Sequence, residues 1–309
     1  MPDIPSALTT RHPRHGAGRD IVARLQKKAL LHLGRGQYHK SEVCLGAALR
    51  TLKSAQAFPS RDHLSLWNQR GMVCKYLGRL KRARQYYRLA LRYAPTCLTG
   101  RDRISFVADI FHNLGGLEHS RRRFRQGEKY ARKGLELRRE LGRSGQAALA
   151  SDMVALAAIL DGLRKFSESE MLYHRALRIY HRELGRNHPE TAVLLNNLAA
   201  LFQATERPSR AEAHYLSSLR IKRRVLAPSH PDVAVTMNNL ATLYRSQGKQ
   251  PAASVLFRSA LEILSASLGN RHPATRAVRT NYRKSIAVLQ KSTSSHHCRG
   301  TALTGPLNT

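Results

Sequence analysis

Few folds accommodate the 42-residue period that runs through the second half of this 309-residue chain. The dipeptide His-Pro begins at residues 188, 230 and 272, and the tetrapeptide Asn-Asn-Leu-Ala begins at residues 196 and 238. Leucine keeps the same spacing at positions 114, 156, 198 and 240. Because several independent positions share one period, the sequence predicts an array of repeated units that pack against their neighbours.

Each unit has the apolar pattern of two helices. In one unit, apolar residues recur at i, i+3, i+4 and i+7 from Leu195 to Phe202, which places them along one side of a helix. A second stripe runs from Ala211 to Leu226. Pro189 suits the first turn of the first helix, where its missing N–H breaks no hydrogen bond. Each 42-residue unit is therefore predicted to be a helix pair.

A shorter form of the same unit is predicted in the N-terminal half. From Trp67 onward, large and small residues follow the spacing of the 34-residue tetratricopeptide pattern, with Gly71 and Tyr87 among them. Arg70 departs from this pattern, because an apolar residue is usual at its position. A weaker unit of the same kind is expected to start near Val22.

The whole chain is predicted to be an all-α helix-turn-helix solenoid. The repeats divide it into a flexible basic N-terminal segment (1–21), two 34-residue units (22–97), an array of longer units with a capping helix (98–290) and a disordered tail (291–309). A cap is expected because an open last unit would expose its apolar face. The expected helix pairs are 22–55, 64–97, 108–141, 150–183, 192–225 and 234–267, and the last helix is 273–290.

The segment from Leu184 to Ala192, with the Asn-Asn-Leu-Ala that follows it, resembles the 42-residue repeat of kinesin light chains. The resemblance is most specific over 184–290 and looser over 108–183, whereas 22–97 resembles the generic 34-residue motif. It implies a right-handed superhelix whose first helices line a concave groove that holds an extended or short helical peptide. About 21 residues without heptads precede the first repeat, so attachment to a motor is not expected.

The resemblance also implies residues for peptide binding, because in this family the second Asn of the pair bonds the backbone of the bound peptide. Ala155 interrupts this row of Asn residues in the fourth unit. The alternative is that these amides bond a neighbouring helix and hold the repeat geometry. The candidate groove residues are Asn113, Asn196, Asn197, Asn238, Asn239, Asn281, Gln69, Lys75, Gln203 and Arg245, and the same register adds Ser65, Asn68, Asp109, His112 and His119.

The predicted function is that of a noncatalytic scaffold or adaptor that binds a peptide segment of a partner protein. Lys and Arg number 53 against 20 Asp and Glu, and the net charge of +33 attracts anionic partners, an acidic peptide among them. The alternative is RNA or DNA bound through the Arg-rich runs 79–92 and 121–143. Arg82 and Arg92 are expected on outward-facing second helices, with few aromatic residues between them for base stacking.

No enzyme, metal or cofactor is expected, because no pattern of a catalytic or phosphate-cradling site stands out. Each His-Pro histidine is expected to cap a helix, and His296-His297-Cys298 gives no defined metal site. The four cysteines show no paired spacing, which favours a reducing compartment such as the cytoplasm. No run is long enough to span a membrane, and arginines near the N-terminus leave organelle targeting open.

Overall fold

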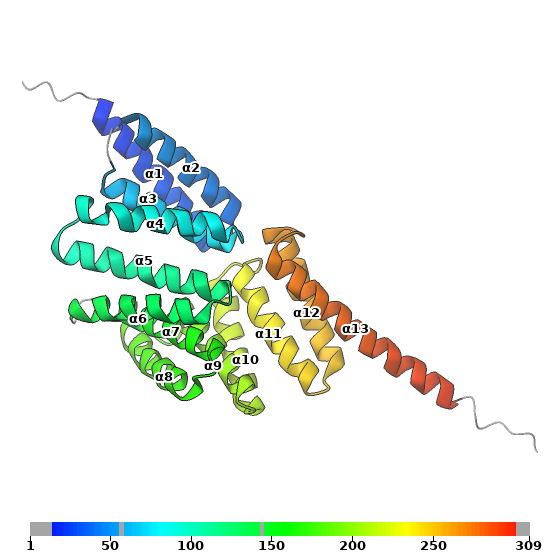
Figure 1. Cartoon of the computed structure of the whole chain (residues 1–309). Helices are drawn as coiled ribbons and strands as arrows, with labels where there is room; N and C mark the ends of the chain where they lie inside the picture. Colours follow the sequence, from blue (N-terminus) through cyan, green and yellow to red (C-terminus); the bar gives the residue numbers. More distant parts are fainter. Residues whose placement is uncertain (1–13, 56–58, 143–144, 301–309) are drawn as a thin grey trace, which may run out of the picture.

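The computed structural model describes residues 14–55, 59–142 and 145–300. Over these residues the chain forms thirteen α-helices and no strand, which confirms the predicted all-α solenoid (Figure 1). The helices are α1 (Arg14–Gly34), α2 (Tyr38–Ala55), α3 (Arg61–Tyr76), α4 (Leu80–Cys97), α5 (Gly100–Ser120), α6 (Phe124–Glu140), α7 (Gln146–Gly162), α8 (Phe166–Glu183), α9 (Pro189–Ala204), α10 (Pro208–Val225), α11 (Pro231–Ser246), α12 (Gln250–Leu268) and α13 (Pro273–Gly300).

The helices follow one another as six pairs, from α1–α2 to α11–α12, and α13 packs on the last pair as the predicted cap. The second helix of each pair ends within one residue of the predicted position. The first helices begin three to eight residues earlier than predicted. The repeat period thus located the pairs, while the starts depend on local signals such as Pro189 and Pro231 at the first helical position.

Two terminal predictions are wrong in part. Residues 14–21 belong to α1 and residues 291–300 to α13, although both were expected to lack regular structure. Extending an existing helix adds one hydrogen bond for each residue fixed, and the sequence holds no Pro or Gly from Lys291 until Gly300. Residues 1–13 and 301–309 of the two predicted segments lie outside the described residues.

Most pairs bury an aromatic residue of their second helix. Tyr87 and Phe257 are fully buried, and so is Tyr173, whose hydroxyl donates to Asp161 at 2.9 Å. The ring of Tyr87 lies against Gly71, where a Cβ atom would come within 2.3 Å of the ring. Gly71 therefore has to be glycine for α3 and α4 to approach this closely.

The histidines of the three His-Pro dipeptides at residues 188, 230 and 272 cap the helices that follow, as predicted. The Nδ1 atoms of His188, His230 and His272 accept hydrogen bonds at 3.1–3.2 Å from the backbone N–H two residues later. These bonds satisfy one of the N–H groups that a helix start leaves without a partner. Among the described side chains, no cluster of three His, Cys, Asp or Glu residues is placed to hold a metal ion.

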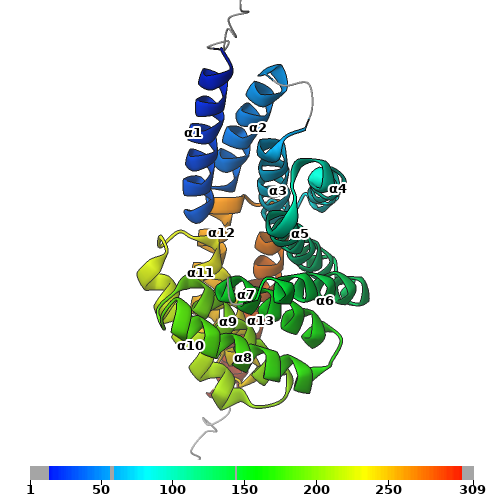
Figure 2. The same cartoon turned by 90° about the vertical axis from the view of Figure 1, so that its left-hand side faces the viewer.

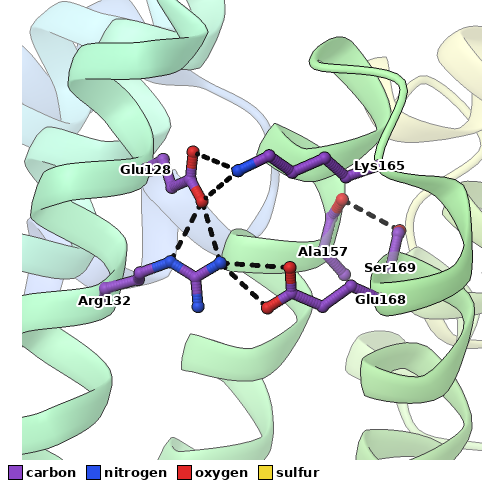
Figure 3. A network of polar contacts seen from close by, with 6 residues as sticks. All are labelled: Glu128, Arg132, Ala157, Lys165, Glu168 and Ser169. Carbon is purple, nitrogen blue, oxygen red and sulfur yellow. Dashed lines mark hydrogen bonds and ion pairs between the residues drawn. The ribbon is translucent and has the colours of Figure 1, made fainter.

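Ion pairs connect the second helices of successive units. Glu128 on α6 meets Lys165 at the start of α8 at 2.8 Å, and Arg132 links Glu128 to Glu168 (Figure 3). Burial would raise the pKa of Glu128, but hydrogen bonds from Lys165 and Arg132 lower it. The same contact recurs at a separation of 37 residues in other units, and we call this series the ion-pair ladder. Its pairs are Glu42–Arg79, Glu128–Lys165, Glu170–Arg207 and Glu212–Lys249.

The superhelix brings its two ends into contact. The His272 Nε2–H donates to the carbonyl of Tyr76 at 2.9 Å, across 196 residues of sequence. Gly36, in the turn between α1 and α2, lies against Pro231 at the start of α11. Figures 1 and 2 show the turns of the N-terminal pairs beside the loops that lead into α11 and α13. We refer to these contacts as the closure.

Two further features concern the environment of the chain. None of the helices in the described part is long and apolar enough to cross a membrane. The cysteines whose side chains the structure describes, Cys44, Cys74 and Cys97, are free thiols. Burial raises the pKa of the Cys74 thiol, which makes it a poor nucleophile.

Candidate functional site

The first helices of successive units, from α3 onward, together with α13, form one continuous face of the superhelix. Along the array, α3, α5, α7, α9, α11 and α13 contact one another in turn. Every candidate groove residue lies on one of these helices. The face is divided into an N-terminal part on α3, α5 and α7 and a C-terminal part on α9, α11 and α13, and the two parts differ in how their polar residues are used.

The N-terminal part is hollowed. One cavity of about 360 Å³ lies between α3 and α5, where Leu64, Met72 and Phe106 supply apolar surface. A second cavity of about 320 Å³ shares Asn68, Met72 and Asp109 with the first and extends to α7. We call the two cavities together the N-terminal hollow. The predicted groove residues that line it are Ser65, Asn68, Gln69, Asp109, His112 and Asn113.

Two asparagines form the central polar feature of this hollow. The Nδ2 of Asn113 donates to the Oδ1 of Asn68 at 2.8 Å, which joins α5 to α3. Within the described part of the chain, the Nδ2 of Asn68 and the Oδ1 of Asn113 bond no protein group, and neither atom is completely buried, although Asn113 as a whole is only 8% exposed. An amide side chain can donate and accept at once. The pair therefore offers one free donor and one free acceptor, as a peptide backbone requires.

An ion cluster that the sequence interpretation missed forms one wall of the hollow. Arg138 reaches in from α6, is 5% exposed, and donates to Asp152 at 2.9 Å and also to Asp109. His112 Nδ1 lies 2.8 Å from the other oxygen of Asp152. A signal was available, because Asp152 is the one charged residue between positions 145 and 160. A lone carboxylate in an apolar helix needs a buried partner.

The charge state of this cluster follows from its contacts. Burial alone would lower the pKa of Arg138, but hydrogen bonds and charges from Asp109 and Asp152 raise it. Arg138 therefore stays cationic and is neutralised by carboxylates. The wall is rigid and offers little unpaired positive charge, so this part of the face does not by itself favour an acidic ligand.

The C-terminal part of the face contains five asparagines bonded in series. Asn281 donates to Asn238 at 3.1 Å and Asn239 donates to Asn196 at 3.2 Å, which links α13 to α11 and α11 to α9. Within each Asn-Asn pair, the first amide donates to the second at 3.4 Å. These contacts match the alternative stated above, in which the amides bond a neighbouring helix. We call this series the asparagine ladder, and it ends at Asn197.

The remaining candidate residues are mostly engaged within the protein. Gln69 bonds Ser65 on its own helix and Gln26 on α1. Gln203 accepts a hydrogen bond from the hydroxyl of Tyr215 at 3.2 Å. Arg245 donates to the carbonyl of Asn281 at 3.4 Å. The structure therefore does not gather these side chains into one site.

Lys75 lies at the closed edge of the face. Its Nζ is 5.3 Å from the ring of Tyr76, which carries the carbonyl bonded by His272. Burial lowers the pKa of Lys75, and the charge of Asp232 on α11 partly opposes this effect. Lys75 thus belongs to the closure as much as to the groove.

Comparison with known proteins agrees with this architecture. Two sequence models of the tetratricopeptide repeat match the chain, one over residues 153–224 and 210–266 and the other over residues 65–97. No protein in the curated set matches the chain significantly. The matched segments fall on the second unit and on the fourth to sixth units.

Solved structures of similar fold extend over most of the chain. A Rap protein complexed with competence and sporulation factor is 11% identical, with a TM-score of 0.69, and the match covers 94% of this chain and 78% of that one. The apo form of RapI is 12% identical, with a TM-score of 0.54 and coverage of 88% and 99%. BtubC (BKLC) from P. vanneervenii is 21% identical, with a TM-score of 0.49 and coverage of 83% and 94%. The chain therefore carries tetratricopeptide repeats over residues 65–97 and 153–266, and its 42-residue repeats resemble those of kinesin light chains.

Proposed function

We propose that the chain is a noncatalytic scaffold that binds an extended segment of a partner protein in the N-terminal hollow. The observation that carries this proposal is the Asn68–Asn113 pair, which presents a free amide donor and a free amide acceptor on the face formed by the first helices. One peptide unit has the complementary N–H and C=O groups.

The surroundings of the pair support a peptide over a small polar molecule. Leu64, Met72 and Phe106 offer apolar surface on one side of the pair. Arg138 and Asp152 hold the other side in place through buried hydrogen bonds. Binding sites commonly combine apolar surface with a few well-placed polar groups. A segment with an apolar side chain next to its bonded peptide unit fits this arrangement.

The C-terminal part of the face has a different role in this proposal. The asparagine ladder uses its amides to connect α9, α11 and α13. It keeps these helices in register and ends at Asn197, whose Oδ1 accepts the last bond of the series. A Rap protein of the same fold was solved in complex with competence and sporulation factor, so the fold is compatible with ligand binding.

The proposal can be tested by affinity capture from a lysate of the source organism after nuclease treatment. Wild type is compared with Asn68→Ala/Asn113→Ala at low salt and at about 300 mM salt, where exposed charge contacts are strongly screened. We expect a protein partner that remains bound at the higher salt and is lost with the double variant.

A matched control removes polar side chains from the outer surface. Arg175 and Arg178 are exposed on α8, so Arg175→Gln/Arg178→Gln leaves the face formed by the first helices unchanged. The control should capture the same partner as wild type. Equal capture by all three proteins would contradict the assignment of the hollow, and capture of nucleic acid alone before nuclease treatment would favour the Arg-rich surfaces instead.

A further inference from the structure

The ion-pair ladder on the outer surface is interrupted at one position. Its acidic residues, Glu42, Glu128, Glu170 and Glu212, each lie five positions after the residue that precedes the second helix of the unit, and on α4 this position is occupied by Arg84. The basic residue that precedes α6 is Arg123, which pairs with no carboxylate in the described part of the chain. The contact between α4 and α6 therefore keeps the basic residue of the ladder and has Arg84 in place of the acid.

A cleft of about 690 Å³ lies beside this interruption, on α3 and α4. Tyr86 and Leu89 supply its apolar surface, and the lining residues are Arg70, Arg82, Gln85, Tyr86, Arg88, Leu89 and Arg92. None of its four guanidinium groups pairs with a carboxylate among the described residues, and the cleft is lined by no acidic side chain. Glu42, the nearby acid of the ladder, is paired with Arg79.

Arg70 is fixed at the back of the cleft. Its guanidinium lies 4.9 Å from the centre of the Tyr86 ring, a cation–π distance. The Nε of Arg70 is buried and has no hydrogen-bond partner. A buried donor without a partner is unfavourable. An anion bound in the cleft would balance the positive charge of the Arg70 guanidinium. Arg70 is also the residue that departs from the apolar pattern of the 34-residue unit.

The other guanidinium groups are arranged along α4. Arg82 and Arg92 are ten residues apart, which corresponds to roughly 15 Å along a helix. Arg88 lies between them and is exposed, as they are. A ligand with one charged group would contact only some of these guanidinium groups. A ligand with several linked oxyanions would contact the guanidinium groups of α4 and that of Arg70 together.

We propose that this cleft, formed by Arg70, Arg82, Arg88 and Arg92 around Tyr86, binds a small ligand that carries two or more linked phosphate groups. Phosphate oxygens accept the parallel N–H bonds of guanidinium groups, and linked phosphates keep several negative charges at neutral pH. The site lies on the outer surface, away from the N-terminal hollow, so it does not depend on the proposed peptide site.

Isothermal titration calorimetry with sodium tripolyphosphate tests the proposal, at two salt concentrations. Pyrophosphate and inorganic phosphate are titrated as shorter probes, and ATP shows whether a nucleoside adds to the affinity. Affinity should rise with the number of linked phosphates. ATP should bind about as tightly as tripolyphosphate if the phosphates alone are recognised, and more tightly if the natural ligand is a nucleotide.

Two variants examine the cleft itself. Arg70→Gln removes the fixed guanidinium, and Tyr86→Glu replaces the aromatic ring of the cleft with an acidic side chain. We expect each to weaken tripolyphosphate binding about tenfold or more, the size of one lost charge-assisted hydrogen bond. Circular dichroism verifies folding. Arg88→Gln/Arg92→Gln changes only exposed side chains and should weaken tripolyphosphate binding by a similar factor. It therefore tests the cleft even where Arg70→Gln does not fold.

Arg175→Gln/Arg178→Gln on α8 is the matched control, because it removes two positive charges from another second helix, as Arg88→Gln/Arg92→Gln does from α4. It should retain tripolyphosphate binding within about threefold, the scale of a screened long-range charge effect. An equal loss in the control, or no binding to wild type, would overturn the proposal. Tighter binding of a single-stranded RNA at the same arginines would also overturn it and would assign the cleft to nucleic acid.

Discussion

The role of a single asparagine in this chain depends on which atoms of its amide are already bonded. At Asn239, the Nδ2 donates to Asn196 and the Oδ1 accepts from Asn238. At Asn68, only the Oδ1 is bonded. The sequence predicted that asparagines on the first helices matter, but the period alone could not distinguish bonds between helices from bonds to a ligand. That distinction depends on how far α9, α11 and α13 are shifted along one another. This shift is set by the packing of whole units.

Asn239→Ala should destabilise the protein by about 1–3 kcal/mol, because it leaves the Oδ1 of buried Asn196 and the Nδ2 of half-buried Asn238 without their hydrogen-bond partner. Chemical denaturation followed by circular dichroism measures the change. Asn197→Ala is the matched control, since Asn197 accepts a single bond at the end of the ladder. A cost for Asn239→Ala no larger than that for Asn197→Ala would contradict the structural role of the ladder.

At the scale of the helix, the repeat period was sufficient to place every pair, and local chemistry determined where each helix starts. The first helices begin earlier than their apolar stripes, because capping and helix elongation extend them. The ion cluster of Arg138 was not predicted because it joins α5, α6 and α7 through residues that do not repeat. The ion-pair ladder does repeat at 42 residues and could have been found from the sequence.

The helix caps make stability depend on pH. Burial lowers the pKa of His230 and His272, and each Nδ1 must be unprotonated to accept its capping bond. In the unfolded chain histidine titrates near a pKa of about 6.5. The unfolded state therefore binds more protons below that pH, and stability present above it is lost as the pH falls.

We expect the melting temperature to fall between pH 7 and pH 5, and to fall less in His230→Asn/His272→Asn. Asparagine can cap a helix but does not titrate in this range. Differential scanning calorimetry at several pH values measures the effect, and the range ends at pH 5 because carboxylates titrate below it. An identical pH dependence in the variant would show that these two histidines do not govern it.

At the scale of the whole molecule, the contacts of Gly36 and His272 turn an open array into a closed one (Figure 2). Arrays of repeats usually contact only sequential neighbours. Here the first two units also touch the loops before α11 and α13, so the curvature of the intervening units determines whether the ends meet. No local sequence pattern encodes that contact, which explains why it was absent from the predictions.

Gly36→Ala should weaken the closure. Gly36 has a positive φ of 69°, and an added Cβ would lie 2.4 Å from a side-chain atom of Pro231. Small-angle X-ray scattering should show a larger radius of gyration than wild type. Gly248→Ala is the control, because Gly248 has a φ of 77° and open space around its Cβ position. Both variants incur backbone strain of roughly 1–2 kcal/mol, but only Gly36→Ala should change the shape.

The most direct measurement for the proposed function is the affinity of a selected peptide for the N-terminal hollow. Peptides are selected from a random library against wild type, and one is titrated into Asn68→Ala/Asn113→Ala and into Arg175→Gln/Arg178→Gln. Loss of two hydrogen bonds to the peptide backbone should weaken binding at least about tenfold in the first variant, and the second should bind as wild type does. Unchanged affinity in Asn68→Ala/Asn113→Ala would show that the peptide binds elsewhere, and the account of the hollow would be wrong.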